Sequence, residues 1–199
     1  MSVTSSPSET ETTTHPLQEF ADRVAEVVGG SAAITFDTVK ITVGSEDWVS
    51  AHTAARDDLD LVFFSWLSAV DWANEVEAGD ALSDEVEERI ELLTTVADLT
   101  EGHRVTFSTD LTKDSPSIAS LVGVYAGANW HEREAGEMFG IEFVGHPNPV
   151  HIYLPESFIG NPLRKSYPLL SREVKPWPGD VDVEPMPDSD EPSTENPGA

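Results

Sequence analysis

The sequence predicts an α+β fold, a two-layer domain with a mixed sheet of about five strands and flanking helices, followed by a long extended Pro-rich C-terminal arm. Two observations support this prediction. Within residues 16–142, patterns typical of helices and strands follow one another as helix, two strands, helix, about three strands and helices. Beyond them, prolines recur from 147 to 168 among large apolar residues. This spacing excludes helices and central strands, whereas the apolar residues need a surface to bury them.

The first half of the domain is expected to contain two helices around a hairpin. A helix opens at Pro16 and ends at Gly29-Gly30, because its apolar residues recur at helical spacing up to those glycines. Residues 34–43 alternate apolar and polar side chains on either side of Asp37-Thr38, as in a hairpin. Ser45 then offers an N-cap for a helix through about Arg56. Its apolar stripe contains Trp48, His52 and Ala55.

The second half is expected to complete the sheet. Residues 61–72 form a buried strand or a strand–helix mixture, because a short apolar run has no decisive period. Residues 74–91 are rich in acids and read as a solvated excursion. Two strands, at 90–99 and around 105–107, then form an antiparallel pair.

Two helices are expected at the end of the domain. Pro116 opens the first, which carries Ile118 and Tyr125. Asn129 caps the second, with Glu132 completing a capping box, and this helix ends at Gly140.

The chain is therefore divided into four parts. Residues 1–15 form a disordered tail rich in Ser, Thr and Glu, and residues 16–142 form the domain. Residues 143–180, which we name the arm, extend and wrap a partner, because a structureless segment beyond about 12–15 residues is uncommon within one domain. Residues 181–199 form an acidic disordered tail.

Composition excludes several classes of function. The net charge of −26 argues against binding to nucleic acid or anionic lipid. The absence of cysteine excludes disulfides, thiolate zinc sites and cysteine-ligated iron–sulfur clusters in this chain. The first residues lack the pattern of a signal peptide, and no run of about 18 apolar residues occurs, so we expect a cytoplasmic protein that reaches membranes only through partners.

The run Glu132-Arg133-Glu134 with Glu137 is the strongest candidate for chemistry. Paired carboxylates beside an arginine could perform acid–base catalysis or, with His131, hold a metal. Helix geometry favours a structural or interface role, because Arg133 and Glu137 lie four residues apart and can form an ion pair. His146 and His151 are isolated histidines for which packing or hydrogen bonding is favoured over ligation. There is no His-Glu-x-x-His motif and no nucleotide-binding glycine motif.

Basic residues concentrate in the arm. Arg164, Lys165, Arg172 and Lys175 form a locally positive strip in an acidic chain. This strip is interpreted as a docking surface, since arginine often fixes the register of a contact with partner carboxylates. A solubilising patch is the alternative.

These residues resemble the signatures of the C subunit of NADH-quinone oxidoreductase, in the respiratory complex I family. WHEREAGEMFGI at 130–141, GHP at 145–147 and F-x-G-x-PLRK at 158–165 match the two blocks of that family. The departures are Glu137 for aspartate, Val150-His151 where arginine is common, and Ser166 for aspartate. The residues carried over as interface or signature positions are Trp130, Glu132, Arg133, Glu134, Glu137, Phe139, Gly140, His146, Pro147, Phe158, Gly160, Pro162, Leu163, Arg164 and Lys165.

The resemblance implies a scaffold subunit of the peripheral arm of a proton-translocating complex, on the cytoplasmic side of the cell membrane. No catalytic centre, cofactor or metal is expected in this chain, whereas FMN, iron–sulfur clusters and quinone are expected in partner subunits. The partners implied are the quinone-pocket subunit and the subunit holding the terminal cluster. One alternative is the equivalent subunit of a membrane-bound hydrogenase or another quinone-reducing dehydrogenase complex. A weaker one is a free-standing carboxylate enzyme.

Overall fold

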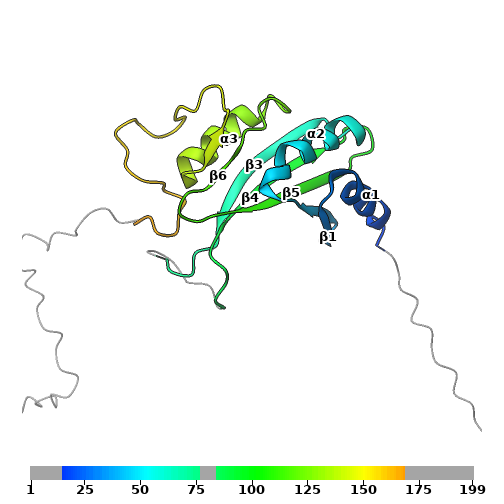
Figure 1. Ribbon diagram of the computed structural model, residues 1–199, viewed down its shortest axis with the longest axis horizontal. Helices are drawn as coiled ribbons and strands as arrows, with labels where there is room; N and C mark the ends of the chain where they lie inside the picture. Colours follow the sequence, from blue (N-terminus) through cyan, green and yellow to red (C-terminus); the bar gives the residue numbers. More distant parts are fainter. Residues whose placement is uncertain (1–14, 77–83, 169–199) are drawn as a thin grey trace, which may run out of the picture. The chain divides into compact units, whose positions relative to one another are not determined.

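The structure is a computed structural model that describes residues 15–76 and 84–168. Its elements are α1 (Gln18–Val28), β1 (Ser31–Thr35), β2 (Thr38–Thr42), η1 (Ser45–Asp47), α2 (Trp48–Asp58), β3 (Phe63–Asp71), β4 (Ile90–Ala97), β5 (Arg104–Leu111), β6 (Ser117–Ala119), α3 (Ala128–Phe139) and β7 (Glu142–Val144). Five strands form one sheet in the order β1-β2-β5-β4-β3, with β2 and β5 parallel and the other neighbours antiparallel. The three α-helices lie on one face of this sheet (Figure 1). The predicted α+β domain with a mixed sheet is confirmed.

The first helix ends where the sequence predicts. Helix α1 begins at Gln18 rather than at Pro16, and its apolar stripe, which includes Phe20 and Val24, is buried. Gly29 adopts the left-handed conformation, with φ at 75°, and its N–H donates to the carbonyl of Ala25. Such a cap favours glycine because it has no Cβ to clash.

The hairpin of β1 and β2 is confirmed, but its turn differs from the prediction. Thr35 pairs with Thr38, so the two residues of the turn are Phe36 and Asp37 rather than Asp37 and Thr38. Both have positive φ, 50° and 59°. A two-residue turn of this hand matches the twist of the strands, which is why the chain adopts it without glycine.

The second helix begins later than predicted. Residues Ser45–Asp47 form the 3-10 turn η1, and α2 starts at Trp48 with Asp47 as its N-cap. The prediction of Ser45 as the N-cap is therefore wrong, since the 3-10 turn separates it from the α-helix. The predicted stripe is confirmed, because Trp48, His52 and Ala55 are all buried.

Residues 61–72 mainly form strand β3, which resolves the predicted ambiguity in favour of a strand. The acidic connection to β4 is tied within its described residues, where the Asn74 side chain exchanges two hydrogen bonds with the backbone of Val86. Glu91 does not belong to a solvated excursion. It lies in β4, where Lys40 Nζ at 2.5 Å and Trp72 Nε1 at 2.8 Å donate to its buried carboxylate.

Strands β4 and β5 pair antiparallel, as predicted.

The helix predicted from Pro116 is wrong. Residues Ser117–Ala119 form β6, which pairs in parallel with β7, and turns follow up to the start of α3. Pairing with a strand more than twenty residues away overrides the local helical spacing, which the glycines at 123 and 127 already weaken.

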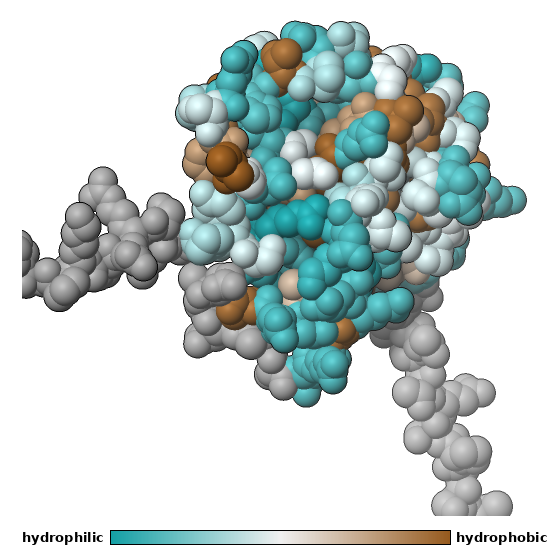
Figure 2. All heavy atoms as spheres, turned by 60° about the vertical axis from the view of Figure 1, so that its left-hand side comes forward, coloured by the Kyte–Doolittle hydropathy of each residue, from teal (hydrophilic) through white to brown (hydrophobic). Residues whose placement is uncertain are grey.

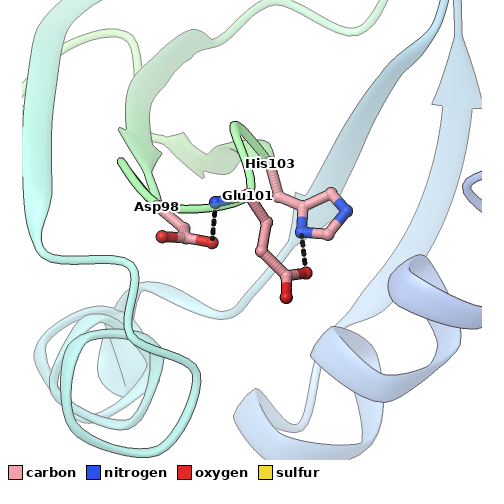
Figure 3. A group of neighbouring side chains, drawn as sticks. All are labelled: Asp98, Glu101 and His103. Atoms are coloured by element: carbon pink, nitrogen blue, oxygen red, sulfur yellow. Dashed lines mark hydrogen bonds and ion pairs between the residues drawn. The ribbon is translucent and has the colours of Figure 1, made fainter.

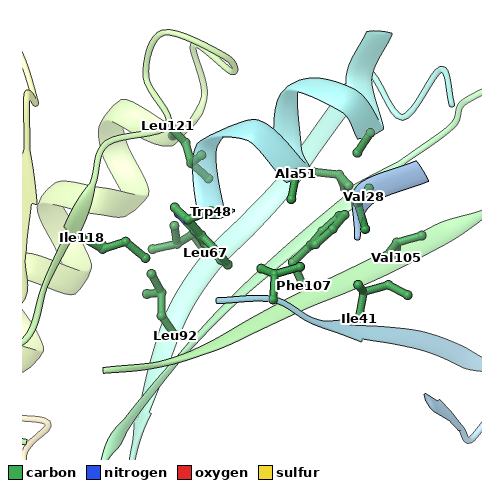
Figure 4. Close-up of a cluster of buried hydrophobic side chains, with 14 of the residues drawn as sticks. Val28, Ile41, Trp48, Ala51, Leu67, Leu92, Val105, Phe107, Ile118 and Leu121 are labelled. Carbon is green, nitrogen blue, oxygen red and sulfur yellow. The ribbon is translucent and has the colours of Figure 1, made fainter. Parts of the chain in front are cut away.

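A single apolar core joins these elements. In Figure 4, Trp48 and Ala51 of α2 face Leu67, Leu92 and Phe107 of the sheet. Ile118 and Leu121 extend this cluster toward α3, which adds Ala128, Ala135 and Phe139. The helix that carries the signature residues is therefore anchored directly on the sheet.

The arm starts within an element, because the predicted boundary at residue 143 falls inside β7. From Gly145 to Pro168 the chain forms no helix or strand. The predicted tails lie outside the described residues, apart from His15, as do residues 169–180 of the arm. In the ranges that the structure describes, none of the helices has the length and apolar composition needed to cross a bilayer.

Candidate interface site

The described part of the arm folds back along α3, and Glu137 holds its middle. The Glu137 carboxylate accepts hydrogen bonds from the backbone N–H groups of Ile152, Tyr153 and Leu154, the first at 2.9 Å. Burial by itself would raise the pKa of this carboxyl, but the three N–H donors hold the pKa below its ordinary value. Glu137 is thus ionised, and its carboxylate accepts the backbone hydrogen bonds that a neighbouring strand would accept in a sheet.

Arg133 anchors the same segment from the preceding turn of the helix. Its Nε donates to the carbonyl of Val150 at 2.8 Å and its Nη2 to that of His151 at 3.4 Å, while the guanidinium lies over the Trp130 ring. The predicted ion pair between Arg133 and Glu137 is therefore wrong. Each side chain satisfies backbone groups of the arm instead, because those groups lack partners in a segment without secondary structure.

Glu132 is buried and does not cap the helix. Its carboxylate accepts from the Ser120 hydroxyl at 2.6 Å and from the Leu121 N–H at 2.5 Å. The N-cap of α3 is Gly127, so the predicted capping box of Asn129 and Glu132 is wrong. Burial raises the pKa of Glu132 to about 7, against the lowering effect of these two hydrogen bonds.

Of the two isolated histidines, only His146 makes hydrogen bonds through its ring. His146 Nε2 lies 3.1 Å from the carbonyl of Asn129, and its Nδ1 accepts the N–H of Asn148 at 3.0 Å. For His146 the prediction of hydrogen bonding is confirmed. His151 is exposed, and only its backbone carbonyl contacts Arg133.

Arg164 and Lys165 fasten the far part of the arm. Arg164 donates to the carbonyl of Phe139 at 2.6 Å and to that of Lys113 at 2.7 Å, so a cation stands at the C-terminal end of α3, where the helix dipole favours it. The Lys165 N–H donates to Asp71 Oδ2 at 2.9 Å, and its Nζ to the carbonyl of Ala73 at 3.2 Å. Both described residues of the predicted four-residue docking strip therefore contact their own chain. Arg172 and Lys175 lie outside the described residues.

Glycines allow the arm to approach the helix end closely. Gly140 ends α3 with φ at 71°, and a Cβ there would lie 2.6 Å from Asn161 Oδ1. Asn161 in turn donates to the carbonyl of Glu137 at 3.0 Å, and the Leu163 N–H donates to that of Met138. Gly160 has φ at 96° and packs against Tyr167, which stacks on Phe158. Pro162, which lies between Gly160 and Tyr167 in the sequence, is half-buried, whereas Pro147 is exposed.

Large apolar side chains remain exposed on this folded surface. Trp130 is 62% exposed, Tyr153 64% and Ile159 89%, and Leu163 is also exposed. Figure 2 shows hydrophobic patches set in a hydrophilic surface on this side of the molecule. A cavity of about 390 Å³ lies between α3 and the start of the arm, lined by residues that include Arg133, Glu137, Phe143, His146 and His151. We name the exposed residues Trp130, Tyr153, Ile159 and Leu163 the arm face.

The structure thus brings the predicted residues of the signature helix and the arm together. They contact each other through hydrogen bonds between side chains and backbone that the sequence does not predict. Most partners of the charged side chains are backbone carbonyl or N–H groups, which carry no sequence signal. Ser120 and Asn161 were also missed. Glu132 could have been placed correctly, because it shares the helical stripe of Ala128, Ala135 and Phe139.

A second cluster of ligand-type side chains lies in the turn between β4 and β5. Asp98, Glu101 and His103 have donor atoms within 4.8 Å of one another (Figure 3). Asp98 accepts the N–H groups of Thr100 and Glu101, which shapes the turn, and His103 stacks on Phe20 with ring centroids 4.3 Å apart. These internal contacts account for the arrangement.

Comparisons with known proteins identify the family. The family described as "Respiratory-chain NADH dehydrogenase, 30 Kd subunit" matches residues 41–173. Relatives named as the C subunit of NADH-quinone oxidoreductase include one from Mycolicibacterium gilvum, 33% identical over 77% of this chain and 68% of its own length. Another, from Citrifermentans bemidjiense, is 32% identical over 71% of this chain and 81% of its own.

Solved structures share the fold. A trypsin-resistant fragment of Nqo5 aligns with a TM-score of 0.52 at 18% identity, covering 65% of this chain and 97% of the fragment. A chain of a membrane-bound sulfane sulfur reductase, an archaeal respiratory membrane complex, aligns with a TM-score of 0.51 at 18% identity, covering 76% of this chain and 82% of its own. The sequence resemblance is confirmed, and the chain belongs to the respiratory-chain NADH dehydrogenase 30 kDa subunit family.

Proposed function

We propose that this chain is a scaffold subunit of an NADH-quinone oxidoreductase complex, with no reaction centre of its own. It docks through the arm face on the subunit that forms the quinone pocket and on the subunit that holds the terminal iron–sulfur cluster. FMN, the clusters and quinone belong to partner subunits. The complex is membrane-bound, and this chain reaches the cytoplasmic side of the membrane through those partners.

One observation carries this proposal. Side chains of α3 fix an irregular segment by its backbone, and that segment presents Tyr153, Ile159 and Leu163 to solvent. Exposed aromatic and aliphatic residues on a rigid surface are typical of interface anchors, because little conformational entropy is lost when they bind. The charged side chains of the signature act as positioning residues for those anchors, since they are directed at carbonyl and N–H groups of the same chain.

The alternative complexes remain distinguishable. The fold is shared with a chain of a sulfane sulfur reductase, so fold alone does not define the electron donor. The relatives of 32–33% identity are named as subunits of NADH-quinone oxidoreductase, which favours NADH as the donor.

Co-purification from detergent-solubilised membranes tests the proposal. The full-length chain should elute with partner subunits that contain flavin and iron–sulfur centres, and that complex should oxidise NADH. The double variant Tyr153→Ser, Ile159→Ser should reduce recovery of the complex at least about fivefold, the effect of losing more than 1 kcal/mol at an interface. Val27→Ser, which changes an exposed apolar residue of α1, is the control and should not change recovery.

Two results would contradict the proposal. One is NADH oxidation or a bound flavin in the purified chain by itself. The other is a complex that assembles fully with Arg133→Ala but has lost quinone reduction, because this would move the signature helix from positioning to chemistry.

A further inference from the structure

A second set of exposed apolar residues lies at the end of the sheet opposite the one that holds Arg164 and Lys165 of the arm. Ala97 pairs with Phe63 on one side and with Arg104 on the other, and Val39 pairs with Val105. The β1–β2 turn, the loop before β3 and the β4–β5 turn therefore meet at one end of the sheet (Figure 1). At the opposite end of the sheet, Asp71 is the last residue of β3 and Lys113 follows β5, and both hold the arm.

We name the apolar residues of these turns, Phe36, Val62, Phe63 and Leu99, the distal rim. Phe36 is 97% exposed and Leu99 69%, and Val62 and Phe63 are about half exposed. The strand order places Phe36 at one edge of the sheet, Leu99 in the middle and Phe63 at the other edge. With strands about 4.8 Å apart, the rim spans roughly 19 Å, which is within the footprint of one protein partner.

The turn that carries Phe36 is also strained. Phe36 and Asp37 both occupy the left-handed region, with φ at 50° and 59°. Asn-Gly is the favoured pair for such a turn, because asparagine and glycine tolerate positive φ and phenylalanine has no local hydrogen bond to offset it. Strain and exposure of the same aromatic ring both oppose the stability of the free chain, and together they indicate a contact outside it.

Charge narrows the chemistry of the partner. Three acids border the apolar residues: Asp60, Asp37, which pairs with His15, and Glu101 of the β4–β5 turn, which pairs with His103. Arg104 is an exposed base at the same end, so acids outnumber arginine and lysine there. This acidic border opposes contact with an anionic lipid surface, whereas it complements lysine or arginine on a protein. Residues 1–14 are mostly Ser, Thr, Glu and Pro without an aromatic residue, so this segment offers little apolar surface to cover the rim.

We propose that the distal rim docks a protein chain, distinct from those on the arm face, that presents an apolar recess bordered by lysine or arginine. The inference rests on the proposed function, because it assumes that the chain works within an assembly. The chain then connects two neighbours, one through the arm face and the other through the distal rim.

Substitution in the full-length chain gives the first test. Phe36→Asn relieves the strained turn, so the melting temperature of the free chain should stay unchanged or rise. The double variant Phe36→Asn, Leu99→Ser should nevertheless reduce recovery of the assembled complex at least about fivefold. Val27→Ser is the control: Val27 lies at the C-terminal end of α1, away from the β1–β2 turn, and its substitution should leave recovery unchanged. Normal recovery of the double variant would overturn the inference.

Photo-cross-linking in membranes gives the second test. A photoreactive phenylalanine at position 36 should capture another polypeptide, at a peptide containing lysine or arginine, and one at position 159 should capture a different polypeptide. Capture at position 36 of lipid, of residues 169–199 of the same chain, of a second copy or of nothing would overturn the inference. If position 159 still captures a protein of the complex, the proposed function stands, whereas no capture at either position would count against both.

Discussion

Glu132 Oε2 lies 4.0 Å from His146 Nε2, in the interior where α3, the Ser120–Val122 turn and the residues after β7 meet. Both side chains are almost fully buried. His146 Nδ1 accepts the Asn148 N–H, so the ring carries its proton on Nε2, which donates to the Asn129 carbonyl. Glu132 therefore faces the Nε2 side of the His146 ring, while the neighbouring Arg133 is directed at the arm.

The buried Glu132 carboxyl predicts that its contribution to the free energy of unfolding falls as the pH rises. Because the folded pKa of Glu132 is raised from 4.5 to about 7, its contribution is fully present below pH 4.5 and is lost as pH rises through 7. Relative to Glu132→Gln, the wild type should lose about 2 kcal/mol of unfolding free energy between pH 5.5 and 8. Urea unfolding at several pH values measures this. A wild-type-to-variant difference that stays constant with pH would refute it.

His52 predicts the opposite slope. It is fully buried between Trp48 and Phe107, and burial lowers its pKa from 6.5 to about 4 against the raising effect of its hydrogen bond to the Trp48 carbonyl. Its stability contribution is present above pH 6.5 and is lost as pH falls toward 4. Relative to His52→Gln, the wild type should lose about 2 kcal/mol between pH 7.5 and 5. Chemical denaturation of both proteins tests this, and parallel pH profiles would contradict it.

Glu137→Ala should loosen the middle of the arm without unfolding the domain. It removes the acceptor of three backbone N–H groups, and hydrogen bonds to a charged group contribute roughly 1.5–3 kcal/mol. We expect the amides of Ile152–Leu154 to exchange about 30-fold faster, equivalent to about 2 kcal/mol. Hydrogen exchange with mass spectrometry measures this, with Glu134→Ala on the same helix as the control. Equal exchange in the two variants would rule out the anchoring role.

Gly140→Ala should destabilise the chain, whereas Gly123→Ala should not. Gly140 has φ at 71°, and a Cβ there would lie 2.6 Å from Asn161, while a Cβ at Gly123 meets nothing within 4 Å. A left-handed alanine costs roughly 1–2 kcal/mol, to which displacement of Asn161 adds. Thermal unfolding compares the two variants. Equal melting temperatures would show that the end of α3 adapts freely.

Part of the fold could be predicted because local patterns and global packing agree. The stripe of α1, the left-handed glycine at 29, the stripe of Trp48, His52 and Ala55 and the β4–β5 pair follow from periodicity and turn residues. The helix predicted from Pro116 failed because β6 depends on pairing with β7, a strand that follows α3. Propensity is a weak guide where a distant strand supplies the hydrogen bonds.

For the candidate site, the sequence by itself determined where the signature helix ends, at Gly140, and that large apolar residues stand among the prolines of the arm. Only the tertiary structure decided what those residues contact. Arg133, Glu137 and Arg164 serve backbone groups of their own chain, and Glu132 enters the core instead of capping α3. The reason is physical: an irregular segment must satisfy its N–H and C=O groups wherever the fold brings a donor or acceptor near. These hydrogen bonds depend on which residues lie close together in the fold, and spacing along the chain does not encode that.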